Sequence, residues 1–141
     1  MPHLYSTKVT AIGGRHGAIR SEDGLLDVRL ALPKSLGGLG GATNPEQLFA
    51  GGYSACFENA LLRVGHEAGV SLRDDDVEVT ADVGLDRNAT GGFVLSVDLA
   101  VTIRGVEQAK AEDLVQRAHK ICPYSNAIRG NIDVGFSVST G

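Results

Sequence analysis

The sequence has few of the features that mark membrane, secreted or nucleic-acid-binding proteins. It contains no stretch of roughly 18 apolar residues, the minimum for a helix that crosses a membrane, and its first residues lack the basic and apolar layout of a signal peptide. Lys and Arg form no run longer than two residues, and the net charge is −4, from 13 basic and 17 acidic residues. These absences argue against a membrane anchor, secretion and a nucleic-acid surface, and we expect a cytoplasmic protein.

Cysteine is scarce as well, with one residue at position 56 and one at position 122. Two cysteines in a chain without a secretion signal are more often reduced thiols than a structural disulfide, and buried thiols usually behave as small apolar side chains. The four histidines lack the spacing of metal ligands, and no glycine-rich segment matches a phosphate-binding or dinucleotide-binding loop. We therefore expect no metal site and no bound nucleotide.

The length of 141 residues suits a single domain, residues 1–141, and several segments alternate apolar and polar residues as strands do. Half-polar alternation with short turns between the segments is typical of antiparallel sheets that expose one face to water. The expected strands are residues 4–12, 17–20, 26–32, 77–85, 93–103 and 132–138.

Two segments have the period of a helix instead. The first begins at Asn44 and Pro45, since Asn suits the N-cap and Pro the first helical position. It is apolar on nearly all sides as far as Val64, which is typical of a buried helix. Glycines at positions 51 and 52 indicate close backbone packing against it, because glycine otherwise weakens a helix. The second, about residues 106–121, is amphipathic and ends where Cys122 precedes Pro123.

The expected order is three strands, a helix, two strands, a helix and a last strand, which makes an α+β domain. One sheet layer from a chain of this length can hardly cover both sides of the first helix. A second copy of the chain is the simplest cover, so we predict an intimate homodimer.

A candidate for thiol chemistry is Cys56, on the apolar stripe of the first helix. Burial alone would raise its pKa and leave it inert, so a reactive thiol here needs a cation brought to it. Arg15 lies in the glycine-rich turn Gly13–Gly17, which can direct a guanidinium inward, and Glu46 could hold that guanidinium in a two-bond pair. The alternative is that Arg15 is a solvated turn residue and Glu46 an ordinary helix-start carboxylate.

Several motifs carry a resemblance to a known family; they are Gly13–Arg15, Asp23–Val28, residues 37–49 (GGLGGATNPEQLF), residues 52–57 (GYSACF) and residues 122–134 (CPYSNAIRGNIDV). The sequence resembles the organic hydroperoxide resistance (Ohr) branch of the Ohr/OsmC family, and the resemblance covers nearly the whole chain. It implies an OsmC/Ohr-like α+β fold, with antiparallel sheets around two central helices, and an intertwined homodimer with a thiol site at its interface.

Residue by residue, the resemblance implies that Cys56 is the peroxidatic thiol, Cys122 the resolving thiol, and Arg15 and Glu46 the activating pair. The Cys56 thiolate would attack an organic hydroperoxide, release an alcohol and become a sulfenic acid, which Cys122 would close into an intramolecular disulfide. No bound cofactor is expected. An external dithiol must reduce the disulfide again, and the family implies dihydrolipoamide on a lipoylated protein.

The aromatic residues of the first helix predict an apolar substrate pocket. Apolar walls from Phe49, Tyr53 and Phe57 would favour an alkyl or fatty-acyl hydroperoxide over hydrogen peroxide, unless Tyr53 and Phe57 belong to the core. Tyr124 is a candidate hydrogen-bond partner of the predicted arginine–glutamate pair. Two other functions stay open: an OsmC-type peroxidase with broader substrates and reductants, and a non-catalytic module whose apolar pocket binds a lipid and whose cysteines are packing.

Overall fold

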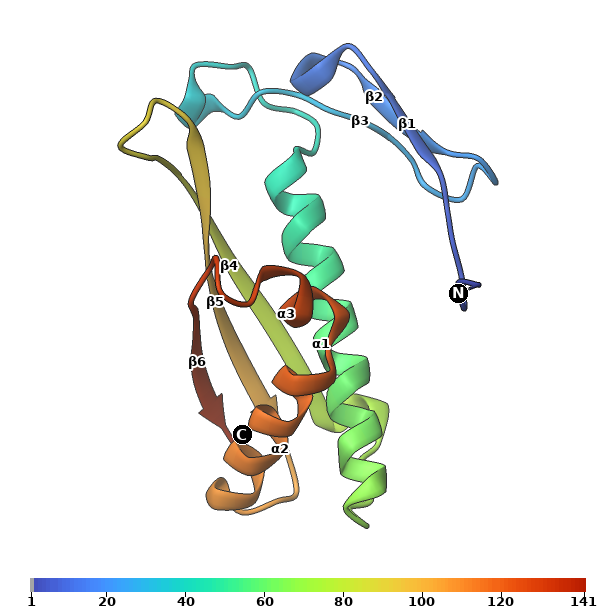
Figure 1. The fold of residues 1–141 in the computed structure, drawn as a ribbon, viewed down its shortest axis with the longest axis vertical. Helices are drawn as coiled ribbons and strands as arrows, with labels where there is room; N and C mark the ends of the chain where they lie inside the picture. The colour runs from blue at the N-terminus through green and yellow to red at the C-terminus, as the bar shows by residue number, and fades with distance from the viewer. Residues whose placement is uncertain (1) are drawn as a thin grey trace. The chain divides into compact units, whose positions relative to one another are not determined.

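The computed structural model describes residues 2–141, which fall into two compact units divided between Leu48 and Phe49. In the first unit, an antiparallel sheet has the order β1–β2–β3, formed by Val9–Ile12, Ala18–Ser21 and Asp27–Arg29 (Figure 1). Strands β1 and β3 are shorter than the expected segments and β2 is shifted by one residue, because only these residues find hydrogen-bond partners in register. Large apolar side chains of this unit stay exposed to solvent; they are Leu4, Tyr5, Val9, Ile12, Leu25, Leu36 and Leu39.

The second unit contains a sheet of order β4–β5–β6, formed by Val77–Arg87, Phe93–Ile103 and Val134–Ser139. Strands β4 and β5 are antiparallel, as expected, but β6 pairs parallel to β5, so the expectation of a purely antiparallel sheet is wrong here. The physical reason is the connection: helices lie between β5 and β6 in the chain, and such a crossover returns the chain in the same direction.

Three helices accompany this sheet: α1 at Pro45–Glu67, α2 at Gln108–Ile121 and α3 at Pro123–Ile128. The sequence patterns did not predict helix α3. Pro123 ends α2, but the same residue suits the first position of a new helix, where its missing N–H costs nothing. No helix among residues 2–141 is long and apolar enough to span a membrane.

The core of the second unit lies between one face of β5 and the helices α1 and α2. The side chains of β5 alternate as predicted, with Val97, Leu99, Val101 and Ile103 buried. Helix α2 buries the predicted apolar stripe except for its last member, Ile121, which is exposed. Burying each such side chain contributes about 1.5–3 kcal/mol. Helix α1 buries only one side in the single chain. The residues along the other side are all exposed; they are Gln47, Gly51, Ala55, Asn59 and Arg63. That a second copy of the chain covers this exposed side of α1 stays a prediction.

Candidate active site

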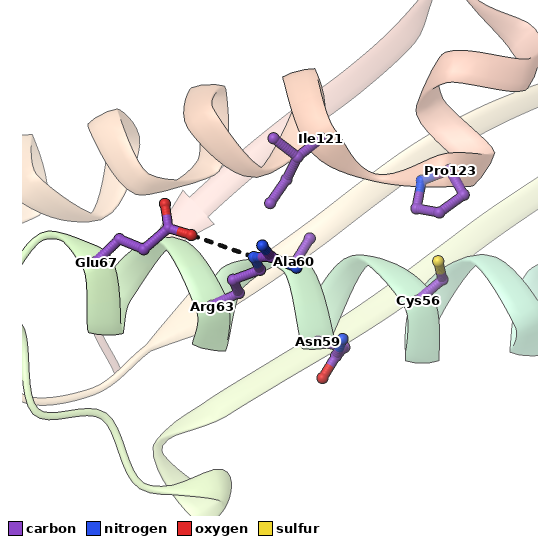
Figure 2. A pocket seen from close by; sticks show the side chains of 7 residues that line it. All are labelled: Cys56, Asn59, Ala60, Arg63, Glu67, Ile121 and Pro123. Carbon is purple, nitrogen blue, oxygen red and sulfur yellow. Dashed lines mark hydrogen bonds and ion pairs between the residues drawn. The ribbon is translucent and has the colours of Figure 1, made fainter. Parts of the chain in front are cut away.

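Cys56 lies midway along α1, where it is half-buried and lines an open groove of about 570 Å³. Figure 2 shows its side chain pointing from α1 toward Pro123, at the junction of α2 and α3. Further along the groove, Arg63 forms an ion pair of 3.1 Å with Glu67, one turn away on the same helix. The groove is completed by Asn59, Ala60 and Ile121. A small molecule can therefore reach the Cys56 sulfur from solvent.

Cys122 is the residue between α2 and α3 and is fully buried. Its N–H donates to the carbonyl of Ala118 at 2.9 Å, and its carbonyl accepts from the N–H of Asn126 at 2.9 Å, so the backbone on both sides is held by helical hydrogen bonds. Both cysteines are free thiols. The sequence could not show that they are neighbours, because they are 66 positions apart in the chain.

The pKa of Cys56 is raised above its ordinary value, first by burial and then by the charge and the hydrogen bond of the neighbouring Cys122 thiol. One contact acts in the opposite direction: the backbone N–H of Tyr124 donates to the Cys56 sulfur and lowers the pKa. Among the described residues of the second unit, no cationic side chain adds to this lowering. Burial therefore keeps Cys56 in its protonated, poorly nucleophilic form unless a cation comes from elsewhere.

The first unit contains the predicted pair of Arg15 and Glu46, and the structure confirms that they contact each other through two hydrogen bonds. Arg15 Nη1 donates to Glu46 Oε1 at 2.6 Å, and Nη2 donates to Oε2 at 3.0 Å. Gly13 and Gly14 adopt positive φ angles of 89° and 58°, which form the turn that carries Arg15. The hydrogen bonds to Glu46 raise the Arg15 pKa. The Arg15 side chain keeps 35% of its exposure, so part of the guanidinium is free for another ligand.

The four aromatic residues expected in a substrate pocket form one cluster. Tyr53 and Phe57 are fully buried, so in the single chain they are core residues, as the alternative expectation had it. Phe49 is half-buried and meets Tyr53 and Tyr124 edge-on, with ring centroids 6.2 and 5.9 Å away. Tyr124 also stacks on Tyr53 at 5.5 Å. Phe49 and Tyr124 are therefore the members of the cluster that retain accessible surface.

Tyr124 also explains one of the two helix glycines. A Cβ atom on Gly52 would lie 2.2 Å from the Tyr124 hydroxyl, so the close packing predicted at this position is confirmed. At Gly51 nothing beyond the helix's own backbone lies within 4 Å of the place where a Cβ would stand, so close packing at this position stays a prediction for the dimer. Tyr124 belongs to the second unit, and its expected role toward Arg15 and Glu46 stays a prediction.

Sequence reasoning missed a buried polar chain beside the thiols. The hydroxyl of Ser125 lies 2.7 Å from the Tyr53 hydroxyl and 2.8 Å from Nδ1 of His119. His119, Cys122 and Ser125 recur every third residue, a spacing that could have indicated that they lie on one side. The expected end of the helix at Pro123 placed Ser125 outside it, so the spacing was not used. Among residues 2–141, no cluster of three or more His, Cys, Asp or Glu side chains could hold a metal ion.

The comparisons with known proteins identify the family and the fold. The sequence model of the OsmC-like proteins matches residues 38–137. The chain belongs to the OsmC-like protein family. The matched region includes Glu46, Cys56 and Cys122, whereas Arg15 precedes it. The α+β fold, with two three-stranded sheets and three helices, is that of solved members of the family.

Several relatives of this OsmC-like protein are organic hydroperoxide resistance proteins by name. The one from Xanthomonas axonopodis pv. citri (strain 306) is 44% identical over 137 residues, which cover 96% of this chain and 95% of that protein. The crystal structure of one from Legionella pneumophila has a TM-score of 0.94 and 52% identity, covering 99% of this chain and 100% of that chain. That of OhrB from Bacillus subtilis has a TM-score of 0.87 and 43% identity, covering 96% and 99%.

Proposed function

We propose that this OsmC-like protein is a thiol-dependent peroxidase that reduces organic hydroperoxides, alkyl or fatty-acyl, to alcohols. The observation that carries the proposal is the pair of neighbouring free thiols: Cys56 opens to a groove, and Cys122 is buried beside it. A first thiol that solvent can reach, beside a protected second thiol, is the arrangement that a two-cysteine redox cycle needs. The names of the relatives, which refer to organic hydroperoxide resistance, support the same function.

The cycle has two steps on the protein. In the first, the Cys56 thiolate attacks one oxygen of R–O–O–H; the O–O bond breaks, an S–O bond forms, and the alkoxide leaves as the alcohol once it gains a proton. In the second, the Cys122 sulfur attacks the sulfur of the Cys56 sulfenic acid; the S–O bond breaks, the disulfide forms and water leaves. Peroxide is reduced by two electrons, and the two thiols are oxidised by two.

The cation that Cys56 needs comes from Arg15 of a second copy of the chain. Ten residues of α1 separate Glu46 from Cys56, and at 1.5 Å per residue this is about 15 Å of helix. In a twofold dimer every contact is reciprocal, so the Arg15–Glu46 pair of each copy serves the Cys56 of the other. The Glu46 carboxylate holds the guanidinium in one orientation, and the exposed side of α1 is the surface that the partner covers.

The exposed glycine of α1 supports this dimer. If Glu46 of one copy approaches Cys56 of the other and the reverse, the midpoint between them on α1 is position 51. Gly51 is exposed, and nothing lies within 4 Å of the place where its Cβ would be. A residue without a side chain at the midpoint lets the backbones of two α1 helices approach closely, which explains a glycine that the single chain does not require.

The disulfide is reduced again by an external dithiol, and dihydrolipoamide on a lipoylated protein is our candidate. No prosthetic group takes part in the cycle, because sulfur alone carries the electrons. The groove beside Cys56 is open enough to admit a dithiol, whose first sulfur attacks the disulfide and whose second sulfur releases the mixed disulfide.

The experiment that tests the proposed function is turnover of tert-butyl hydroperoxide with dihydrolipoamide as reductant. We expect the wild-type protein to consume many equivalents, and faster than it consumes hydrogen peroxide. In the absence of dihydrolipoamide, Cys122→Ser should reduce one equivalent per chain and then stop with Cys56 as a sulfenic acid, because Cys56 has no internal partner with which to form a disulfide. Cys56→Ser should consume none. Sustained turnover by Cys56→Ser would show that this thiol is not the site of reaction.

A further inference from the structure

A chain of three polar side chains joins the three helices near the thiols. Tyr53 comes from α1, His119 from α2 and Ser125 from α3, and the Ser125 hydroxyl lies between the other two at 2.7 and 2.8 Å. Ser125 and Tyr53 are both fully buried. A buried hydroxyl cannot replace a lost partner with water, so this chain holds the three helices at a fixed distance from one another.

The direction of the hydrogen bonds follows from the protonation states. Burial, and then the nearby Arg129 cation, lower the pKa of His119, so its ring is neutral at neutral pH. Burial raises the pKa of Tyr53, so its phenol keeps its proton. When Nδ1 of the neutral ring is unprotonated, it accepts from Ser125, and the Ser125 oxygen then accepts from Tyr53. All three groups are thereby satisfied without a charge.

The spacing along each helix places this chain around the reacting sulfurs. Cys56 follows Tyr53 by three residues on α1. Cys122 is three residues after His119 and three before Ser125, at the junction that joins α2 to α3. Any movement of α3 relative to α1 must therefore change the distance between the two sulfurs.

We propose that the Tyr53–Ser125–His119 chain is a positioning device for the resolving step, which sets α3 against α1 and holds the Cys122 sulfur in line with the sulfenic acid of Cys56. The proposal rests on the proposed function. In this step the Cys122 thiol loses its proton, its sulfur displaces oxygen from the Cys56 sulfur, and the proton and hydroxide leave together as water. A displacement at sulfur requires the reacting atoms close and aligned, and a misplacement of about 1 Å can cost a hundredfold in rate.

Tyr53→Phe is the sharpest test, because it removes one hydroxyl and keeps the buried ring. The two steps are measured separately by rapid mixing with one equivalent of cumene hydroperoxide: loss of peroxide reports the first, and the decay of dimedone-trappable sulfenic acid reports the second. We expect the second step to slow about tenfold more than the first. Tyr5→Phe, which removes the same hydroxyl from a side chain that is 77% exposed, should change neither step.

Two further variants separate positioning from general damage to the fold. Ser125→Ala should slow the second step as Tyr53→Phe does, and the double variant should be no slower than either single variant, because one chain is broken in all three. His119→Asn keeps an acceptor close to the position of Nδ1 and should recover much of the rate that His119→Leu loses.

The outcomes separate this inference from the proposed function. If wild-type protein forms the disulfide and Tyr53→Phe forms it equally fast, the positioning role is wrong while the peroxidase stands. The same holds if Tyr53→Phe slows both steps equally, or if the effects of Tyr53→Phe and Ser125→Ala multiply. If wild-type protein forms no sulfenic acid, the proposed function fails first and the positioning role fails with it.

Discussion

Arg15→Lys is expected to lower the rate of peroxide reduction about 100-fold, although it keeps a positive charge. Arg15 is held by Glu46 through two hydrogen bonds of 2.6 and 3.0 Å, and a planar guanidinium can make such a pair while still presenting N–H groups to a peroxide. Lysine offers a single ammonium on a flexible stem. Loss of one preorganised donor to a developing oxyanion typically costs about 10²–10³ in rate.

Arg15 could act by lowering the pKa of the Cys56 thiol or by positioning the peroxide, and the expected magnitudes distinguish these two roles. Lowering a thiol pKa from about 8.5 to about 5.5 raises the thiolate fraction at pH 7 roughly thirty-fold. The same change reduces the nucleophilicity of the thiolate by roughly 15–30-fold, for a Brønsted slope of about 0.4–0.5. For a thiol of ordinary pKa these effects nearly cancel, so a cation that only shifted the pKa of such a thiol would gain little. Positioning the peroxide and stabilising charge on the departing oxygen must supply most of the acceleration.

The measurement is the second-order rate constant for cumene hydroperoxide, together with the thiolate absorbance of Cys56 as a function of pH. Arg15→Lys should lose rate even where its thiolate fraction equals that of the wild type. Glu46→Ala should show a milder loss, because the guanidinium remains but is no longer held in one orientation. Turnover of Arg15→Lys near the wild-type rate would disprove the positioning role of the guanidinium.

Gly51→Leu is expected to dissociate the dimer and to abolish most of the activity with it. Overpacking a tight contact typically costs about 1–3 kcal/mol, and in a twofold interface each substitution acts twice, so the dissociation constant should rise at least about thirtyfold. The fold of the single chain should survive, since nothing lies within 4 Å of a Cβ at position 51 and leucine favours a helix more than glycine does.

Sedimentation velocity and a thermal unfolding curve test this prediction together. We expect Gly51→Leu to sediment as a monomer at concentrations where the wild type is a dimer, with unfolding still cooperative. His66→Leu is the control, because it also adds an apolar side chain to an exposed position of α1, but 15 residues from the proposed midpoint. A dimeric and fully active Gly51→Leu protein would show that the α1 helices do not cross there.

The sequence predicted those parts of the fold that depend on periodicity. Strand β5 has the expected bounds, Phe93–Ile103, and α2 buries its expected stripe except for Ile121, because a strict alternation or an amphipathic helix leaves one choice of buried face. The direction of β6 was missed, since alternation is the same in parallel and antiparallel strands. The helix between β5 and β6 was the available signal for a parallel crossover.

The sequence likewise predicted some parts of the candidate site and missed others. A glycine-rich turn, a helix start and complementary charge made a contact between Arg15 and Glu46 one of two interpretations, and the family resemblance favoured it. The depth of each aromatic on α1 could not, because a helix that is apolar on nearly all sides does not show which face is buried, and Tyr53 proved to be core. The polar chain through Ser125 depends on how three helices pack, which no local pattern encodes.

The most direct test of the central claim is a thiol titration with intact mass, before and after one equivalent of cumene hydroperoxide. The peroxidase cycle predicts that both thiols disappear and that each denatured chain loses about 2 Da, the mass of two hydrogens, because Cys56 and Cys122 close an internal disulfide. If both thiols persist while the peroxide remains, the cysteines are packing, and a module that binds an apolar ligand replaces the peroxidase as the better description of this protein.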